Sequence, residues 1–336
     1  MWYKKLFFIL LSCILMVQCS KPNEWWKEAE IGVMADSTDW EALGGPLKQV
    51  YEKVVRTPQI EKMFVLKYVT DEDFMRYTKF QYLILAATLE SKGRVRTLID
   101  NVLKDPGIRK GVEKGDHFVF IQKNQWAKNQ LVVILVSKNL PVLIQHIQSN
   151  RDFLFGIFKN DFEKRLEKDM FHNRENKEEQ QRLMSTFGWT IRLQKDYFLA
   201  QEISDKGFLW YRRMYPERWI FVRWINGGDS TLLNEKWVVG ERNRIGSEYY
   251  GGDHVADQYL FSHKGTFLGR PAQITTGLWA NEAKEVGGPF KNYTFYDALS
   301  ERVYMIDLAV FAPGKDKLPY LRRMDIIAGT FKTVFE

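Results

Sequence analysis

The sequence contains few cysteines, and both lie near its start. Among the 336 residues only Cys13 and Cys19 are cysteines. If residues 1–18 are removed as a signal peptide, Cys19 is the only thiol left, so the mature chain has no internal disulfide. The body of the chain therefore lacks a cysteine nucleophile and the ligands of a zinc–thiolate site.

Several motifs of enzymes and nucleotide-binding proteins are also missing. The sequence has no GxSxG elbow, no Walker A loop, no dinucleotide-binding GxGxxG and no HExxH. It has no dense basic run, and its formal net charge of +7 falls to 7 − 2 = +5 once Lys4 and Lys5 are removed. A modest positive excess reflects an anionic membrane surface, or nothing specific, rather than nucleic acid. We therefore expect no nucleic-acid partner, no metal and no cofactor.

Long apolar runs are limited to one short segment at the N-terminus. Lys4 and Lys5 precede the apolar residues 6–17. Twelve residues are too few to span a bilayer, which takes roughly 18 or more, but they suit the core of a secretory signal. The segment ends at Cys19, and a polar stretch, Ser-Lys-Pro-Asn, follows.

This arrangement resembles a bacterial lipoprotein signal, in which the chain is cut before a cysteine that is then acylated, for example with palmitate. We expect a signal peptide over 1–18, lipidation of Cys19 and a tether over 19–29. Gln18 stands where a small residue is usual. Cys13 is the alternative, because Leu10-Leu11-Ser12-Cys13 matches the motif better but leaves a shorter apolar segment. The prediction is an exported protein anchored in the cell envelope by lipid.

The rest of the chain is long and apolar enough for two folded halves. Residues 30–175 alternate apolar strands, notably 80–89 and 130–137, with helices, and a long helix over 139–171 is expected to brace a sheet. Residues 188–336 are richer in aromatics and end in an amphipathic helix over 316–331. Adjacent strand pairs favour an α+β fold with mixed, largely antiparallel sheets braced by helices. Two ferredoxin-like halves are an open alternative.

Several short stretches in this order and spacing resemble one family. They are Glu30-Ile31-Gly32-Val33-Met34, Pro58-Gln59-Ile60-Glu61, Trp126-Ala127-Lys128-Asn129-Gln130, Gly277-Leu278-Trp279, Gly287-Gly288-Pro289-Phe290 and Phe311-Ala312-Pro313. The chain from about residue 30 to residue 331 is thereby similar to a family of Bacteroidetes envelope lipoproteins, domain of unknown function 4837. The resemblance implies a lipid anchor and an envelope location. It brings no activity, so it assigns no catalytic residues.

Two of these stretches hold candidate binding residues. Trp126 and Trp279 are of the type that forms an aromatic platform for a sugar or a peptide, although tryptophans also serve as core residues. The run Gly287, Gly288, Pro289 and Phe290 allows backbone N–H groups to approach a ligand closely. The same run also suits a tight connection into a strand at Tyr293, with Phe290 filling the core.

The His/Asp-rich stretch 246–269 contains the remaining candidates. Asp253, His254, Asp257 and His263 form a polar cluster in the sequence, but His254 and His263 are nine residues apart and match no metal-binding pattern. A His–Asp pair for general base work is the other interpretation. If the four side chains converge in a pocket, an enzyme is favoured.

These observations lead to two hypotheses from different classes. The first is a non-enzymatic envelope lipoprotein that binds a protein or polysaccharide, or that serves in assembly. The alternative is a hydrolase of envelope or glycan material that uses a loop at 246–269. The missing catalytic motifs favour the first.

Overall fold

The computed structural model describes residues 29–70 and 73–336. The predicted signal peptide, most of the tether and the lipidation site, whether Cys19 or Cys13, lie outside these residues. Within the described ranges, none of the helices combines the length and apolar character that a bilayer crossing requires.

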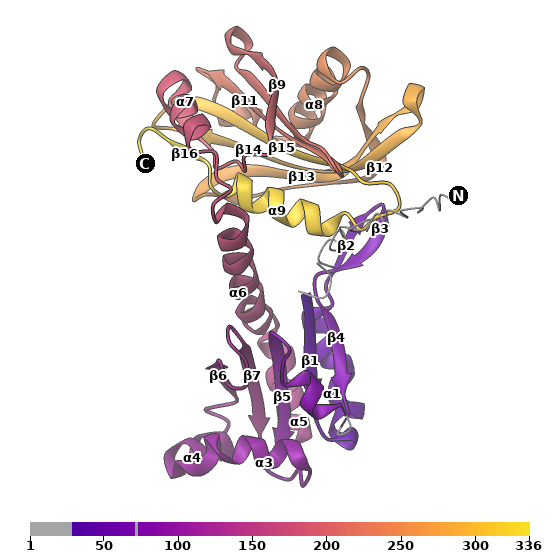
Figure 1. The fold of residues 1–336 in the computed structure, drawn as a ribbon, viewed down its shortest axis with the longest axis vertical. Helices are drawn as coiled ribbons and strands as arrows, with labels where there is room; N and C mark the ends of the chain where they lie inside the picture. Colours follow the sequence, from indigo (N-terminus) through magenta and orange to yellow (C-terminus); the bar gives the residue numbers. More distant parts are fainter. Residues whose placement is uncertain (1–28, 71–72) are drawn as a thin grey trace, which may run out of the picture.

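The N-terminal part contains a five-stranded sheet in which four strands are parallel (Figure 1). Only β6 runs antiparallel to its neighbour β7. The order across the sheet is β4 (Val65–Val69), β1 (Glu30–Met34), β5 (Tyr82–Thr88), β7 (Leu131–Ser137) and β6 (Val119–Lys123).

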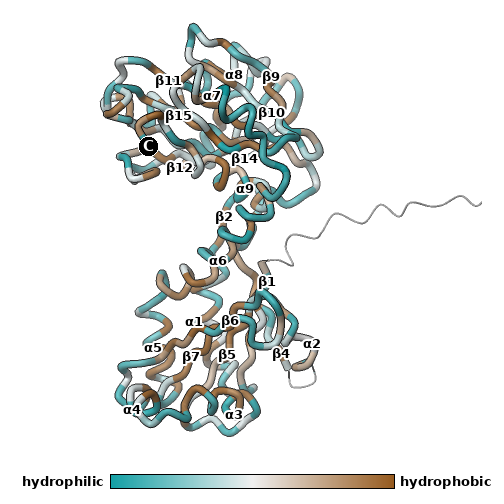
Figure 2. The backbone as a smooth tube through the Cα atoms, turned by 60° about the vertical axis from the view of Figure 1, so that its left-hand side comes forward, coloured by the Kyte–Doolittle hydropathy of each residue, from teal (hydrophilic) through white to brown (hydrophobic). Residues whose placement is uncertain are grey.

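Helices cover both faces of this sheet, because its central strands are apolar on both sides. Every residue of β5 and β7 is buried, and Figure 2 shows hydrophobic residues concentrated on these strands. Tyr82 and Ile84 face a core formed with one set of helices, whereas Leu83 and Leu85 face the other. The first set is α1 (Ser37–Tyr51), α5 (Leu140–Ser149) and α6 (Arg151–Phe171), and the second includes α2 (Phe74–Tyr77), α3 (Arg94–Asp100) and α4 (Pro106–Lys114).

The predicted long helix over 139–171 is two helices. The Asn139 side chain caps α5 through the Val142 N–H, as expected for asparagine at this position. The helix ends at Ser149, and Asn150 separates it from α6 with a backbone that is not helical. Helix α6 then extends from the N-terminal part to the C-terminal part (Figure 1).

The C-terminal part contains a seven-stranded antiparallel sheet. One face packs against α8 (Glu235–Tyr249) and the other against α9 (Leu318–Ala328). Helix α7 (Lys177–Phe187) follows α6, and a short ladder joins β8 (Trp189–Thr190) to β16 (Lys332–Thr333). The order across the large sheet is β12 (His254–Phe267), β13 (Arg270–Asn281), β14 (Val286–Asp297), β15 (Arg302–Phe311), β11 (Glu217–Asn226), β10 (Phe208–Arg213) and β9 (Phe198–Ile203).

A hairpin of β2 (Val54–Thr57) and β3 (Gln59–Lys62) lies between α1 and β4 in the sequence and contacts α9 of the C-terminal part. The buried Glu61 carboxylate accepts the N–H groups of Lys317 (2.9 Å) and Leu318 (3.0 Å) at the start of α9. A carboxylate there satisfies free helix donors and meets the positive end of the helix dipole. Arg322 of α9 donates in return to the carbonyl of Met63.

The α+β class with mixed, largely antiparallel sheets is confirmed. The alternative of two ferredoxin-like halves is wrong, because the first sheet is mostly parallel and the second is a single antiparallel sheet of seven strands. The stretch 246–269 is also not a loop, because it consists of the end of α8 and the long edge strand β12. The sequence of this strand shows no regular alternation of polar and apolar residues, because its pairing with β13 shifts register between Ala256 and Phe261.

Candidate functional site

The four residues of the predicted polar cluster do not converge. His254 lies opposite Ala280 and His263 opposite Ile274 on the regular strand β13. Six residues of strand separate these partners by about 20 Å. No group of three or more metal-ligating side chains occurs within the described ranges.

Each member of the cluster has a separate environment. His254 lies 3.5 Å from Glu282, Asp257 is exposed, and the exposed His263 packs against the ring of Phe261. Asp253 alone is buried, and it accepts a hydrogen bond from the Asn281 amide at 2.7 Å. Burial raises the pKa of the Asp253 carboxyl.

The two candidate tryptophans lie in different parts of the molecule. Trp126 is partly exposed in the turn between β6 and β7. Its backbone N–H donates to the side-chain oxygen of Gln130 at 3.0 Å. The Gln130 amide donates in turn to the carbonyls of Thr78 and Phe80, both at 2.7 Å. This turn is organised by Gln130, and Trp126 does not form a platform with Trp279.

Trp279 instead lines an aromatic pocket of about 590 Å³ beside the C-terminal end of α8. Its indole ring lies 5.0 Å from that of Trp219 on β11 and 6.2 Å from the ring of Phe311 on β15. The ring of Trp210 on β10 lies 4.4 Å from that of Tyr250. We call this site, lined by Trp210, Trp219, Tyr250, Trp279 and Phe311, the aromatic pocket.

The aromatic pocket has buried hydrogen-bond donors that lack partners. The indole N–H groups of Trp210, Trp219 and Trp279 make no hydrogen bond within the described residues, and neither does the hydroxyl of Tyr250. Tyr250 is 9% exposed and Trp279 is 3% exposed, and burial raises the pKa of the Tyr250 hydroxyl. A buried donor left unpaired costs about 1–3 kcal/mol. These four donor atoms have almost no exposed area, and donors of the same kind occur elsewhere in the described residues, for example on Tyr51 and Trp189.

Charged side chains occur at the rim of the same pocket. Lys284 donates to the carbonyl of Tyr250 at 3.1 Å, and Arg212 forms an ion pair with Glu217. The Asn281 amide donates to the carbonyl of Gly251 at 3.0 Å as well as to Asp253. These contacts fix the chain that follows α8 and thereby position Tyr250.

The Gly-Gly-Pro-Phe run lies within β14, not in a loop before it. Gly288 pairs with Trp279, and a Cβ on Gly288 would meet the carbonyl oxygen of Val310 at 2.0 Å and the Trp279 indole nitrogen at 3.1 Å. Gly287 similarly lies close to the Trp279 carbonyl. Gly288 therefore provides space for the Trp279 ring, and both glycines allow β14 to lie close to the backbone of its neighbours. Phe290 is buried with its ring 3.9 Å from the Arg242 guanidinium, and Pro289 faces the opposite side, toward α9.

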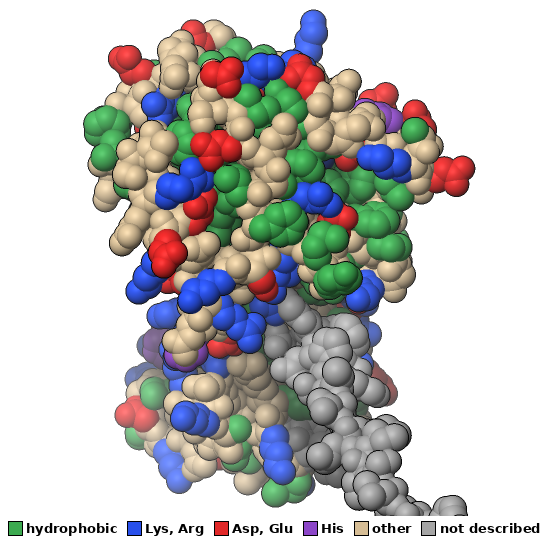
Figure 3. Space-filling view, turned by 45° about the horizontal axis from the view of Figure 1, so that its top comes forward, with side chains coloured by type: hydrophobic (Ala, Val, Ile, Leu, Met, Phe, Trp, Pro, Cys, Tyr) green, Lys and Arg blue, Asp and Glu red, His purple; other side chains and the backbone are tan. Residues whose placement is uncertain are grey.

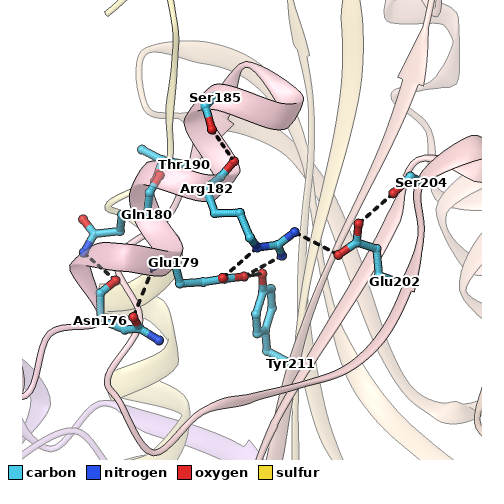
Figure 4. Close-up of polar contacts among 9 residues, drawn as sticks. All are labelled: Asn176, Glu179, Gln180, Arg182, Ser185, Thr190, Glu202, Ser204 and Tyr211. Atoms are coloured by element: carbon cyan, nitrogen blue, oxygen red, sulfur yellow. Dashed lines mark hydrogen bonds and ion pairs between the residues drawn. The ribbon is translucent and has the colours of Figure 1, made fainter.

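A second polar cluster holds α7 against the sheet (Figure 4). Arg182 donates to both oxygens of Glu179 (2.7 and 2.8 Å) and to Glu202 on β9 at 3.0 Å. The hydroxyl of Tyr211 on β10 also donates to Glu179. The charged groups of this cluster are paired with one another, so the arrangement is explained by packing of the helix.

Sequence reasoning missed four walls of the aromatic pocket, which are Trp210, Trp219, Tyr250 and Phe311. Both tryptophans belong to residues 188–336, the region that the sequence marks as rich in aromatics. No local pattern indicates that Trp210 and Trp219 lie near Trp279. Their strands β10 and β11 are separated from β13 by β14 and β15 in the sheet.

The fold and site define a two-part α+β protein with a ligand-sized pocket in its antiparallel C-terminal part. Residues 175–330, which make up that part, match the family model described as Domain of unknown function (DUF4837). Residues 27–171 match a second family model, Domain of unknown function (DUF8532). The expected family is thus confirmed for the C-terminal part. Its predicted extension from residue 30 is not, since the earlier stretches fall within the second model.

No curated protein matches the chain. Three solved structures show distant similarity. A protein from Bacteroides thetaiotaomicron VPI-5482 has 5% identity and a TM-score of 0.28, with 44% of this chain and 45% of that chain covered. The Ran-binding protein Mog1p of Saccharomyces cerevisiae has 12% identity and a TM-score of 0.29, covering 44% and 90%. LpqN, involved in cell envelope biogenesis of Mycobacterium tuberculosis, has 12% identity and a TM-score of 0.29, covering 43% and 82%. These TM-scores are too low to carry a functional argument.

Proposed function

We propose that this protein is a lipid-anchored envelope lipoprotein whose C-terminal part binds a sugar ring of an envelope glycan in the aromatic pocket. The anchor rests on the sequence before residue 20. The ligand rests on one observation, a pocket of about 590 Å³ walled by aromatic rings whose four buried donors have no partner within the described residues. Binding, not turnover, is the proposed activity.

A sugar ring fits the chemistry of these walls. Its two faces present C–H groups that pack on aromatic rings, and its edge presents hydroxyl oxygens that accept hydrogen bonds. Trp219 and Trp279 offer both an apolar ring and an N–H group. The volume of about 590 Å³ also lies in the range of roughly 300–1,000 Å³ that is typical of small-ligand pockets. A protein partner would use a larger and flatter surface.

The histidine-based hydrolase has little support from this geometry. His254 and His263 are on separate segments of β12, and neither lines the aromatic pocket. The pocket includes Asp253 and Glu217, but Asp253 is bonded to Asn281 and Glu217 is paired with Arg212. Incubation of bound glycans with the protein tests this alternative directly, since shortened products would favour a hydrolase.

The binding test uses a glycan array followed by calorimetry with the best ligand. Trp279→Phe keeps an aromatic ring but removes the N–H donor, so affinity should fall about fivefold, the equivalent of a hydrogen bond of about 1 kcal/mol. Tyr250→Phe should have a similar effect. Trp126→Phe is the matched control and should bind as the wild type does. If no glycan binds, or if Trp279→Phe and Trp126→Phe bind equally, the glycan proposal is wrong.

The anchor is tested separately by mass spectrometry of the N-terminal peptide from protein purified out of membranes. The expected result is a chain that begins at Cys19 and has acyl groups on that residue. An unmodified Cys19 excludes this anchor, and acylation at Cys13 selects the alternative cleavage.

A further inference from the structure

A cleft of about 840 Å³ lies between the two parts of the molecule. It is bounded by α6, α9, the strands β12–β14 and the β2–β3 hairpin. Figure 1 shows α9 beneath the large sheet, with α6 near one of its ends and the β2–β3 hairpin near the other. We call it the interdomain cleft; it lies on the α9 side of the large sheet, whereas the aromatic pocket lies on the α8 side.

One wall of the interdomain cleft is apolar and partly uncovered. Leu278 on β13 pairs with Pro289 on β14, and both line the cleft together with Leu318 of α9. At its mouth Phe261 is 63% exposed and Val54 is 55% exposed. Figure 3 shows hydrophobic side chains gathered on one face of the C-terminal part. Large side chains of this kind remain accessible at a cost, which an apolar ligand would remove.

The charges around the cleft are unbalanced. Its three acidic residues are each paired with a base: Glu163 with Lys159 at 2.6 Å, Asp325 with Lys291 at 2.9 Å, and Glu167 with Arg192 at 2.6 Å. Three further cations line the cleft and have no carboxylate within ion-pair distance in the part of the chain that the structure describes; they are Arg56, Lys164 and Arg322. Burial lowers the pKa of Arg322, and Glu163, Asp325 and the buried Glu61 act to raise it from beyond ion-pair distance. For Arg322 an anionic ligand would therefore add a direct contact to these distant ones.

Arg322 is the only one of these three cations that is buried in the described structure, and it is 9% exposed. Its guanidinium donates to the Met63 carbonyl and lies 4.9 Å from the Phe162 ring. Its Nε has no hydrogen-bond partner within the described ranges. Burial lowers the pKa of Arg322 to about 10, so this side chain is charged at neutral pH. Because its Nε has no partner in the described structure, the guanidinium also lacks a full set of acceptors.

We propose that the interdomain cleft binds an anionic amphiphile, with its carboxylate or phosphate at Arg322 and its acyl chain along Leu278, Leu318 and Phe261. Two sources provide this chemistry, a free fatty acid and a phospholipid headgroup with its chain. The proposal does not depend on glycan binding, because the two sites share no lining residue.

The test uses the full chain in phosphatidylcholine vesicles with trace photoactivatable lipids. Three probes have the same diazirine-bearing acyl chain: a fatty acid, a phosphatidic acid and an uncharged monoacylglycerol. After irradiation, peptide mass spectrometry locates the label. One or both anionic probes should label peptides containing Leu278 or Leu318 about tenfold more than the neutral probe, as expected for a charge-assisted contact. The stronger anionic probe identifies the source.

Variants then connect the label to the cleft. Arg322→Gln should lower labelling by the anionic probes about tenfold, and Lys164→Gln should lower it less, since Lys164 is exposed. Leu278→Trp fills the apolar wall and should lower labelling by all three probes. Lys110→Gln on α4, an exposed lysine far from the cleft, is the matched control and should change nothing.

Three results would overturn the proposal. The first is equal labelling of the cleft by the neutral and anionic probes. The second is label that falls outside peptides lining the cleft. The third is unchanged labelling in both Arg322→Gln and Leu278→Trp. If near-ultraviolet circular dichroism shows that Arg322→Gln does not fold, Lys164→Gln and Leu278→Trp decide, and unchanged labelling in both rejects the site.

Discussion

The two sheets of this protein bury different kinds of residue. In the N-terminal sheet, β5 and β7 are buried throughout, and their sequences YLILAAT and LVVILVS are almost entirely apolar. In the C-terminal sheet, buried positions of β13–β15 include Gln273, Thr275, Asn292, Thr294 and Asp307. A buried polar group costs free energy unless it finds a partner. The first sheet has few such groups, among them Thr88 and Ser137, whereas the second has many and requires an account of each.

That account separates groups that are paired from groups that are not. Asn292 donates to Asp307 at 2.9 Å, and the Thr294 hydroxyl donates to Asn292 at 2.8 Å. The Gln273 amide donates to the Ser262 hydroxyl at 2.8 Å. The indole donors of the aromatic pocket have no partner within the described residues, and the same holds for Asp307 Oδ1 and for the Trp189 indole on the α9 side. Unpaired buried groups therefore occur on both sides of the C-terminal sheet.

The largest expected effect comes from the buried ion pair beneath α8. Arg242 Nε lies 3.1 Å from Asp307 Oδ2, and the two side chains are 3% and 0% exposed. Asp307→Asn would leave the guanidinium buried without a counter-charge, which should lower the free energy of unfolding by about 3–5 kcal/mol. Urea denaturation measures this change.

The N-terminal part offers a matched control for this variant. Glu113 pairs with Arg109 on the exposed surface of α4 at 3.3 Å. Glu113→Gln should lower the free energy of unfolding by about 0.5 kcal/mol or less. Equal effects of Asp307→Asn and Glu113→Gln would show that the burial of charge does not distinguish the two sheets.

The next prediction concerns two glycines whose substitution by alanine should change the free energy of unfolding in opposite directions. Gly288→Ala would place a Cβ 2.0 Å from the Val310 carbonyl oxygen, so β14 and β15 must separate. Overpacking of this kind costs typically about 1–3 kcal/mol, and the aromatic pocket should lose ligand affinity with it. Gly156 lies within α6, and its nearest neighbour to an added Cβ is the Asn160 amide at 3.9 Å. Gly156→Ala should therefore raise the free energy of unfolding by about 0.5–1 kcal/mol.

Thermal unfolding measures both glycine variants. If Gly288→Ala unfolds at the temperature of the wild type, the close approach of β14 to β15 does not constrain this position. If Gly156→Ala is destabilised, α6 packs more tightly there than its backbone geometry indicates. Either result would contradict the expected difference in packing, in which α6 has space for a Cβ at Gly156 and the sheet has none at Gly288.

Sequence patterns predicted the elements of the N-terminal part well, because its strands are long apolar runs. The stretches 80–89 and 130–137 correspond to β5 and β7. The same patterns did not reveal that these strands are parallel, since pairing direction depends on crossovers that local periodicity does not encode. The break at Asn150 was also missed, because the apolar spacing continues from α5 into α6.

The site was less predictable than the fold. Trp279 and Gly288 were singled out by local composition, and they do meet, because β13 and β14 are consecutive antiparallel strands. Trp210 and Trp219 join them only through the order of the whole sheet. The His/Asp stretch was misleading because a polar edge strand has the same composition as a functional loop. Only the three-dimensional arrangement shows which donors lack partners.

The smallest expected effect is a pH dependence at the cluster that holds α7. Hydrogen bonds from Arg182, and then from Tyr211, hold the pKa of Glu179 below its ordinary value of 4.5. A lowered pKa in the folded state gives stability that is present above the ordinary value and is lost as the pH falls through the folded value. Glu179→Gln should therefore unfold about 1 kcal/mol more easily than the wild type at neutral pH. The difference should shrink as the pH is lowered to about 3. Urea denaturation at several pH values measures it, with Glu113→Gln as the exposed control. A difference that stays constant down to acidic pH would mean that Glu179 contributes through its shape and not through its charge.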